Sequence, residues 1–169
     1  MNDSEDIWKS LDLHRHEVLN ALQLIRAYGQ LGKTESQLAQ VDRLAEWIHS
    51  LSLWNREWIK HSKHCLLLVM TDRRIHLSNV DTVDSMSAED SRVLAAFLSG
   101  LTQLLSVIEW TSVHLAIVHR SVGEPWQIYL DGSSGSILHI ERLRDLCVAH
   151  STRNVTFLMR IESNAQTGG

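Results

Sequence analysis

The sequence contains little proline and glycine, the two residues that most often interrupt helices. One proline, Pro125, and eight glycines occur in 169 residues. This scarcity favours long helices over at least part of the chain. Hydrophobic residues make up 44% of the sequence, which is enough for one ordinary core or two small ones and argues against a disordered chain.

Long apolar runs and basic clusters are also missing. The longest strongly apolar run, 65–70, is far shorter than a membrane span, and the acidic segment 1–6 does not resemble a signal peptide. The net charge is −4, and lysine and arginine are dispersed along the chain. We therefore expect a cytoplasmic protein that binds neither a membrane nor nucleic acid.

Cysteine is scarce as well. Cys65 and Cys147 are the only two, and neither lies in a Cys-x-x-Cys pair. Two cysteines cannot form a disulfide framework, and free cysteines are usually buried, so we expect two buried thiols in a reducing compartment. His61, His64 and Cys65 approach the spacing of zinc ligands but lack a fourth ligand, so no metal site is expected.

Apolar residues at helical spacing predict two long helices in the first third of the chain. The first covers about 7–31, with Gly32 as a C-terminal cap. The second begins at Thr34, where Gln37 completes a capping-box pattern, and runs to about residue 60. Its apolar stripe repeats as a heptad seam formed by Val41, Leu44, Ile48, Leu51 and Trp58, with Trp47 and Trp54 on either side.

Two helices joined by a few residues form an antiparallel hairpin, which cannot enclose a core by itself. Two such hairpins can enclose one as a four-helix bundle. We therefore predict that residues 1–62 form a helical hairpin domain that dimerises as a four-helix bundle, so that the protein is a homodimer.

The remainder of the chain mixes both kinds of secondary structure. Residues 63–74 fit either a short helix or an apolar strand, because periodicity does not distinguish the two. Strands are predicted at 75–80, 113–119, 126–130 and 154–161, and helices at 87–110 and 137–148. The predicted fold class is α+β, with the hairpin followed by a small α/β sandwich over 63–162 and a disordered tail over 163–169.

His16 lies on the first predicted helix, opposite the apolar stripe. Its face also carries Asp12, Asn20, Gln23 and Ala27, so this face is polar and accessible to a partner. Neutral imidazole is a nucleophile near pH 7, and phosphoryl transfer depends mainly on positioning, so an exposed histidine on a rigid helix can carry a phosphoryl group. Position alone does not distinguish this role from that of an ordinary solvated histidine.

The segment 16–25, HEVLNALQLI, resembles the phosphoacceptor motif of the sporulation initiation phosphotransferase family, and is similar to that of citrate/malate-type sensor kinases. The preceding Arg15 also fits, and the hairpin followed by an α/β domain resembles that family over nearly the whole chain. The resemblance implies that His16 is phosphorylated, that Asn20 orients it or the incoming acyl phosphate, and that Glu17 polarises the imidazole. The implied partner-docking positions are Asp12, Arg15, Leu19, Gln23 and Ala27.

The resemblance also implies that the second domain is a degenerate histidine-kinase ATPase domain. The kinase pattern Asn-Leu-Leu-x-Asn-Ala falls at 103–108, where Gln103 and Val107 replace the asparagines, and valine cannot ligate Mg²⁺. The pattern Asp-x-Gly-x-Gly falls at 131–135 with its first glycine displaced by one residue, which favours an ordinary turn. We expect this chain to bind no nucleotide or other cofactor.

The implied function is that of a phosphorelay enzyme in sporulation initiation. His16 would accept a phosphoryl group from the aspartyl phosphate of a single-domain response regulator, and would pass it to the aspartate of a transcription-factor-type regulator. The regulator would supply Mg²⁺. One alternative is a non-catalytic dimeric scaffold derived from a sensor kinase. A kinase core that still binds ATP weakly is another.

Overall fold

A computed structural model of the chain describes residues 3–54, 56–59, 63–108, 112–132 and 137–160. The fold is α+β, as predicted, with five α-helices and a four-stranded mixed sheet in these ranges. The elements in chain order are α1 (Asp3–Gln30), α2 (Thr34–Trp54), the 3₁₀ helix η1 (Glu57–Ile59), α3 (Lys63–Met70), β1 (Ile75–Thr82), α4 (Ala88–Val107), β2 (Val113–His119), β3 (Trp126–Gly132), α5 (Ile137–His150) and β4 (Val155–Arg160). The predicted tail, 163–169, lies outside the described residues.

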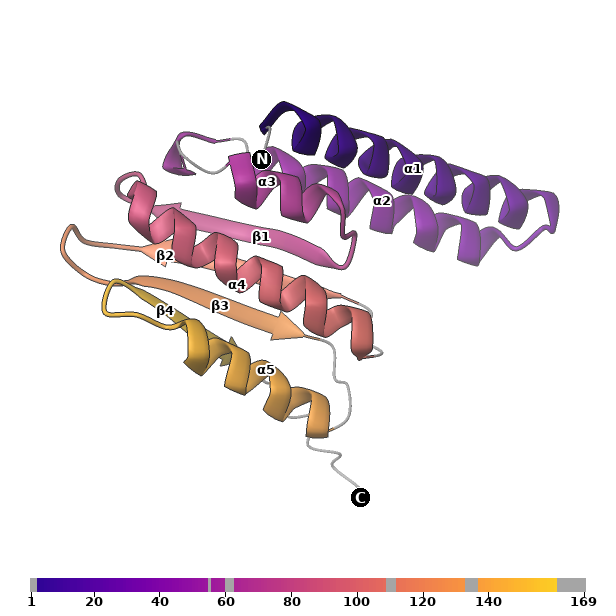
Figure 1. The fold of residues 1–169 in the computed structure, drawn as a ribbon. Helices are drawn as coiled ribbons and strands as arrows, with labels where there is room; N and C mark the ends of the chain where they lie inside the picture. Colours follow the sequence, from indigo (N-terminus) through magenta and orange to yellow (C-terminus); the bar gives the residue numbers. More distant parts are fainter. Residues whose placement is uncertain (1–2, 55, 60–62, 109–111, 133–136, 161–169) are drawn as a thin grey trace, which may run out of the picture.

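The first two helices form the predicted antiparallel hairpin, and its tip projects beyond the end of the sheet (Figure 1). Gly32 closes α1 with a φ of 66°, a conformation that glycine adopts without a steric penalty. The next N–H, that of Lys33, donates to the carbonyl of Tyr28 at 2.9 Å. The predicted C-terminal cap is therefore confirmed.

The second helix ends at Trp54, earlier than the predicted end near residue 60. The reason is the side chain of Trp58, which packs against the C-terminal end of α2. Its indole N–H donates to the Leu53 carbonyl at 2.9 Å, and Trp58 is buried. The prediction that Trp58 continues the seam of a helical bundle is wrong, because it packs in the core of the α/β part instead.

The sheet has the strand order β1-β2-β3-β4. Strands β1 and β2 are parallel, β2 and β3 antiparallel, and β3 and β4 parallel. All four predicted strands are present. Strand β3 is longer than predicted, because Asp131 and Gly132 pair with His114 and Val113 of β2. The first two residues of the predicted turn at 131–135 therefore belong to the sheet, and the next three lie outside the described residues.

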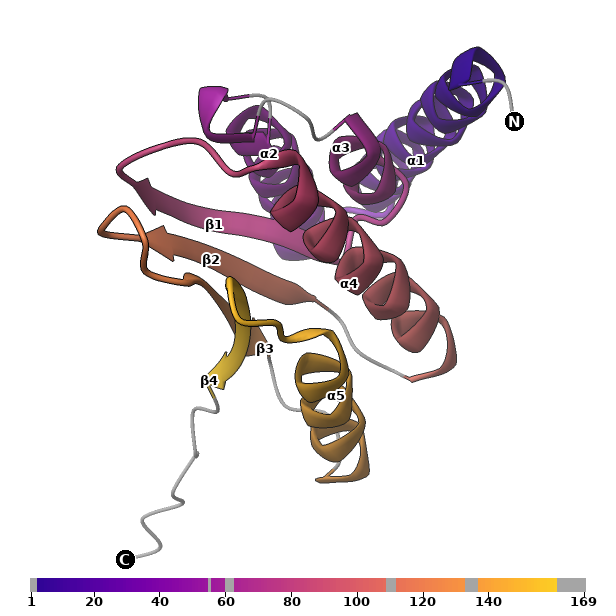
Figure 2. The same cartoon turned by 60° about the vertical axis from the view of Figure 1, so that its left-hand side comes forward.

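Helices α4 and α5 cover one face of the sheet (Figures 1 and 2). The predicted start of α4 is confirmed, since the Ser87 hydroxyl accepts a hydrogen bond from the Asp90 N–H at 3.1 Å. Phe97 of α4 stacks on Phe157 of β4 with ring centroids 3.9 Å apart. The segment 63–74, for which helix and strand were both open, forms helix α3 over most of its length.

The C-terminal half of α2 covers the outer edge of β1. The N–H of Leu77 donates to the Ser50 hydroxyl at 2.6 Å, and the Trp47 indole donates to the Val69 carbonyl of α3 at 3.3 Å. Leu53 and Trp54 belong to the same buried cluster as the sheet and α4. One core thus extends across the predicted domain boundary at residue 62, and the division into 1–62 and 63–162 stays a prediction. No helix in the described ranges is long and apolar enough to cross a bilayer.

Candidate functional site

His16 is exposed on α1. The residues predicted to share or flank its surface are exposed as well: Asp12, Arg15, Leu19, Asn20, Gln23 and Ala27. Arg15 and Asp12 form an ion pair at 3.2 Å, with both side chains mostly in solvent. The structure therefore places the whole predicted set on one accessible surface of the hairpin, as the helical projection predicts. The functional roles of these residues stay predictions.

The two near neighbours of His16 that point inward attach this turn of α1 to the rest of the protein. The ring of His14 lies 4.9 Å from that of Trp47, and its Nδ1 lies 3.3 Å from the carbonyl oxygen of Met70. Glu17 forms an ion pair at 2.9 Å with Nε of Arg73, in the turn between α3 and β1. The helical turn that carries the exposed imidazole of His16 is thus fixed by the contacts of His14 and of Glu17.

This arrangement bears on the predicted role of Glu17. Its carboxylate faces Arg73, on the packed side of α1, whereas His16 faces solvent. Sequence spacing could not reveal this contact, because Arg73 lies far along the chain and in a turn. That Glu17 polarises the imidazole stays a prediction.

The positions compared with kinase nucleotide motifs lie on α4 and at the end of β3. Gln103 and Val107 lie on the last turns of α4, where Val107 is 70% exposed. Asp131 and Gly132 end β3 as ladder residues rather than as part of a turn. That this chain binds no nucleotide stays a prediction.

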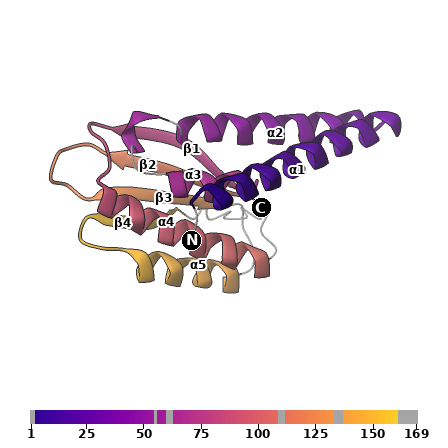
Figure 3. The same ribbon diagram turned by 45° about the horizontal axis from the view of Figure 1, so that its top comes forward.

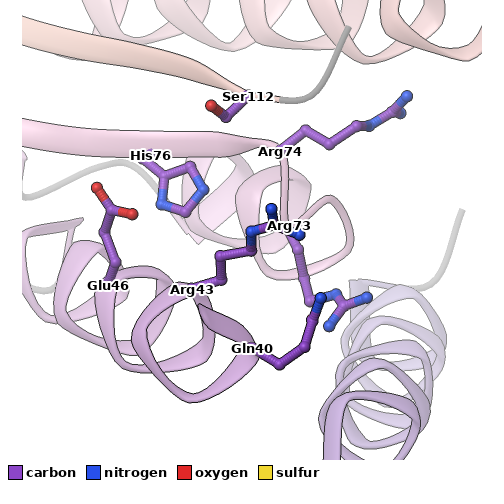
Figure 4. A pocket seen from close by; sticks show the side chains of 7 residues that line it. All are labelled: Gln40, Arg43, Glu46, Arg73, Arg74, His76 and Ser112. Atoms are coloured by element: carbon purple, nitrogen blue, oxygen red, sulfur yellow. The ribbon is translucent and has the colours of Figure 1, made fainter. Parts of the chain in front are cut away.

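A second group of polar residues, which sequence reasoning missed, lines a cleft of about 500 Å³ between α2 and the beginning of β1 (Figure 4). The lining residues are Gln40, Arg43, Glu46, Arg73, Arg74, His76 and Ser112. They come from three separate places in the sequence, and their spacing follows no motif. Only the packing of α2 against the edge of β1 brings them together.

Both thiols are buried, as predicted. Burial raises the pKa of Cys65 to about 12 and that of Cys147 to about 11, so neither is a nucleophile near neutral pH. Within the described ranges, no group of three histidine, cysteine or acidic side chains is arranged to hold a metal ion. His61 of the zinc-like spacing lies outside the described residues.

One comparison with known proteins matches the hairpin. The family model described as sensor kinase SpoOB-type, alpha-helical domain, matches residues 1–56. This match relates the chain to the sporulation phosphotransferases or sensor kinases and therefore to two-component signalling. No curated protein and no solved structure matches the chain.

Proposed function

We propose that this protein is a phosphorelay phosphotransferase that carries a phosphoryl group on His16 between two response regulators, in sporulation initiation. One observation carries the proposal. His16 and Asn20 are exposed one turn apart on α1, inside the segment that the SpoOB-type family model matches. A solvated histidine elsewhere on the chain lacks this context.

In each step of the proposed reaction, the phosphoryl group forms one bond and breaks another. A ring nitrogen of neutral His16 attacks the phosphorus of the regulator's aspartyl phosphate, and the acyl P–O bond breaks to return the carboxylate. The second regulator's aspartate then attacks the phosphohistidine, which restores the imidazole. Such a step needs positioning and charge stabilisation more than a protein base. The regulator supplies Mg²⁺ at its own aspartate.

The surface around His16 suits a docked regulator. Asn20 lies one turn along the helix, where its amide reaches either the imidazole or the transferring group. Asp12, Arg15, Leu19, Gln23 and Ala27 form the accessible surface on either side. Glu17 completes the proposed set by polarising the imidazole, for which it has to exchange its contact with Arg73 for one with His16.

The protein is proposed to act as a homodimer through a four-helix bundle. Large apolar side chains of the hairpin are exposed in the single chain, and they occur on both helices. Their exposed fractions are Trp8 70%, Leu11 40%, Leu22 49%, Val41 41% and Ile48 50%. Val41 and Ile48 belong to the predicted heptad seam. Exposed apolar side chains of this kind are what two hairpins bury when they pair.

In this proposal the α/β part is a degenerate kinase ATPase domain, and the protein consumes no ATP. The supporting observation is Val107, a side chain that cannot bind Mg²⁺, at the place of a kinase asparagine. Calorimetric titration with ATP and Mg²⁺ is expected to show no heat of binding. Measurable binding would favour the kinase alternative instead.

The decisive experiment is transfer of labelled phosphate from a phosphorylated single-domain response regulator to the purified protein. Wild type is expected to become labelled with acid-labile, alkali-stable phosphate, and His16→Gln to stay unlabelled while keeping its fold by circular dichroism. His49→Gln is the matched control, because His49 is also an exposed histidine on a hairpin helix. Labelling of His16→Gln would refute the site. A wild-type protein that binds the regulator but takes up no label would establish the scaffold alternative.

A further inference from the structure

The cleft between α2 and β1 contains a cationic side chain without a carboxylate partner. Arg43 projects from α2 into this cleft (Figure 4), and no ion pair joins it to a carboxylate within the described ranges. The other two arginines are already paired. Arg73 contacts Glu17 at 2.9 Å, and Arg74 contacts Asp72 at 2.7 Å. Of the three arginines that line the cleft, Arg43 is therefore the one without an ion pair in the described ranges, and it is exposed to solvent.

Other hydrogen-bond donors line the same cleft. The guanidinium of Arg73 has five N–H groups, and its ion pair with Glu17 is made through Nε. The side-chain amide of Gln40 and the hydroxyl of Ser112 line the same cleft. Glu46 lies beside the His76 ring (Figure 4), and its carboxylate is 3.6 Å from Nδ1 of His114. Arg43 and Gln40 lie on the other side of that ring (Figure 4).

His76 supplies an independent indication that the cleft binds a ligand. Its side chain is 5% exposed, and its Nδ1 is buried without a hydrogen-bond partner in the described part of the chain. A buried polar atom without a partner costs free energy, so such atoms in native proteins usually have a ligand or water as partner. The ring is held in place by stacking on His114, with centroids 5.0 Å apart and planes 12° apart.

The electrostatics of His76 are consistent with this role. Burial, and to a lesser extent the neighbouring His114, lower the pKa of His76 below its ordinary value. The imidazole is therefore neutral near pH 7, and in the tautomer that carries its proton on Nδ1 it donates a hydrogen bond to an anion. Positive charge in the cleft comes from the arginines.

We propose that this cleft binds a small phosphate monoester, whose phosphate group contacts Arg43, Arg73 and His76. Guanidinium groups match phosphate oxygens in pairs, and a phosphate has three acceptor oxygens for donors that arrive from different directions. A carboxylate has two oxygens in one plane and satisfies fewer of these donors. The volume of about 500 Å³ falls in the range of small-molecule sites, so it leaves room for the organic part of the ester.

The proposed site shares Arg73 with the ion pair beneath His16. A phosphate that draws the Arg73 guanidinium into the cleft competes with Glu17 for it. Ligand binding and the Glu17–Arg73 contact therefore oppose each other, and removal of the Glu17 charge has to strengthen ligand binding. This consequence concerns binding alone, so it can be tested without any assumption about phosphotransfer.

The test is calorimetric titration of the full chain with ribose 5-phosphate at low ionic strength, with ribose and acetate as comparison ligands. We expect one ribose 5-phosphate per chain and no measurable binding of ribose or acetate. Arg43→Ala is expected to weaken binding about ten-fold or more, the usual effect of losing a charge-assisted hydrogen bond. Glu17→Gln is expected to tighten it several-fold. Arg142→Ala is the matched control, since Arg142 is exposed on α5, and it is expected to bind like wild type.

A second measurement does not depend on affinity. The ring nitrogens of His76 are followed by ¹⁵N NMR, with His76→Asn used to assign the signal, and ribose 5-phosphate is expected to shift Nδ1. Absence of binding by wild type, equal affinities of Arg43→Ala and Arg142→Ala, or an unmoved His76 signal at saturation would overturn the site. Binding of acetate as tight as that of ribose 5-phosphate would overturn the assignment to phosphate esters. An unchanged affinity in Glu17→Gln would remove Arg73 from the site.

Discussion

The carboxylate of Glu17 lies 2.9 Å from Nε of Arg73, so the residue next to His16 is tied to the turn that precedes β1. This contact joins the hairpin to the α/β part directly beneath the proposed phosphoacceptor. Both side chains are about one-third exposed, which places the pair between a surface ion pair and a buried one.

A double-mutant cycle on Glu17→Gln and Arg73→Gln is expected to give a coupling free energy of about 0.5–1 kcal/mol in urea unfolding, because solvent screens the pair in part. The comparison pair is Asp81 and Arg120, whose charged atoms lie 4.0 Å apart with both side chains mostly exposed. Its coupling is expected to be smaller. Equal couplings for the two pairs would show that the contact at Glu17 has no special role in joining the hairpin to the sheet.

The hydrogen bond from Leu77 to Ser50 is predicted to stabilise the junction of α2 with the sheet. Ser50→Ala removes the acceptor of a buried N–H on the edge of β1, so a loss of about 1–3 kcal/mol in the free energy of unfolding is expected. Ser52→Ala is the matched control on the same helix, because the Ser52 hydroxyl is exposed and donates only to the carbonyl of His49. It is expected to change stability by less than about 0.5 kcal/mol. Similar effects of the two substitutions would contradict this account of how the edge of β1 is covered.

His76 is predicted to make the folded protein less stable in acid. Its pKa is lowered in the folded state by burial and by His114, against the opposing effects of Glu46, the Arg73 backbone and Asp72, so the unfolded chain binds the proton more readily. The contribution of His76 to the free energy of unfolding is therefore fully present above the ordinary histidine pKa. It is lost as the pH falls from that value towards the lowered pKa of His76 in the folded protein. Arg43 of α2 also lines the cleft at His76.

The measurement is urea unfolding at pH 7 and pH 5 in a buffer without phosphate. His76→Gln is expected to lose less stability than wild type between these two values. His49→Gln removes an exposed imidazole and serves as the control. If His76→Gln and wild type show the same difference between pH 7 and pH 5, burial of His76 does not govern the acid response.

The exposed side of the hairpin is predicted to be the dimer interface. Ile48 is 50% exposed on the predicted seam, so Ile48→Glu places a charge inside the proposed four-helix bundle and is expected to convert the dimer to a monomer. Sedimentation equilibrium should give twice the chain mass of 19.3 kDa for wild type and the single-chain mass for the variant. Val122→Glu is the control, since Val122 is 81% exposed in the turn between β2 and β3. A monomeric wild type, or a dimeric Ile48→Glu, would contradict the proposed bundle.

Much of the secondary structure follows from local physics and was therefore predictable. The lack of proline in residues 1–62, the periodic apolar residues and Gly32 determine the hairpin, because each acts within a few residues of the backbone it controls. The N-terminal cap of α4 by Ser87 also involves residues that are close in the sequence. Where prediction failed, a distant contact was responsible. Trp58 ends α2 early because its indole bonds to the Leu53 carbonyl and its ring packs in the core.

The accessible position of His16 was also determined by the sequence, since helical periodicity alone assigns it to the face opposite the apolar stripe. The contacts of the residues around it, by contrast, depend on the tertiary structure. Glu17 contacts Arg73 and His14 contacts Trp47 because α1 packs against α2 and α3. Arg43 and His76 line one cleft because α2 packs against the edge of β1. Such contacts join residues that are distant in the chain through the shape and burial of whole elements, and no local pattern of residues encodes them.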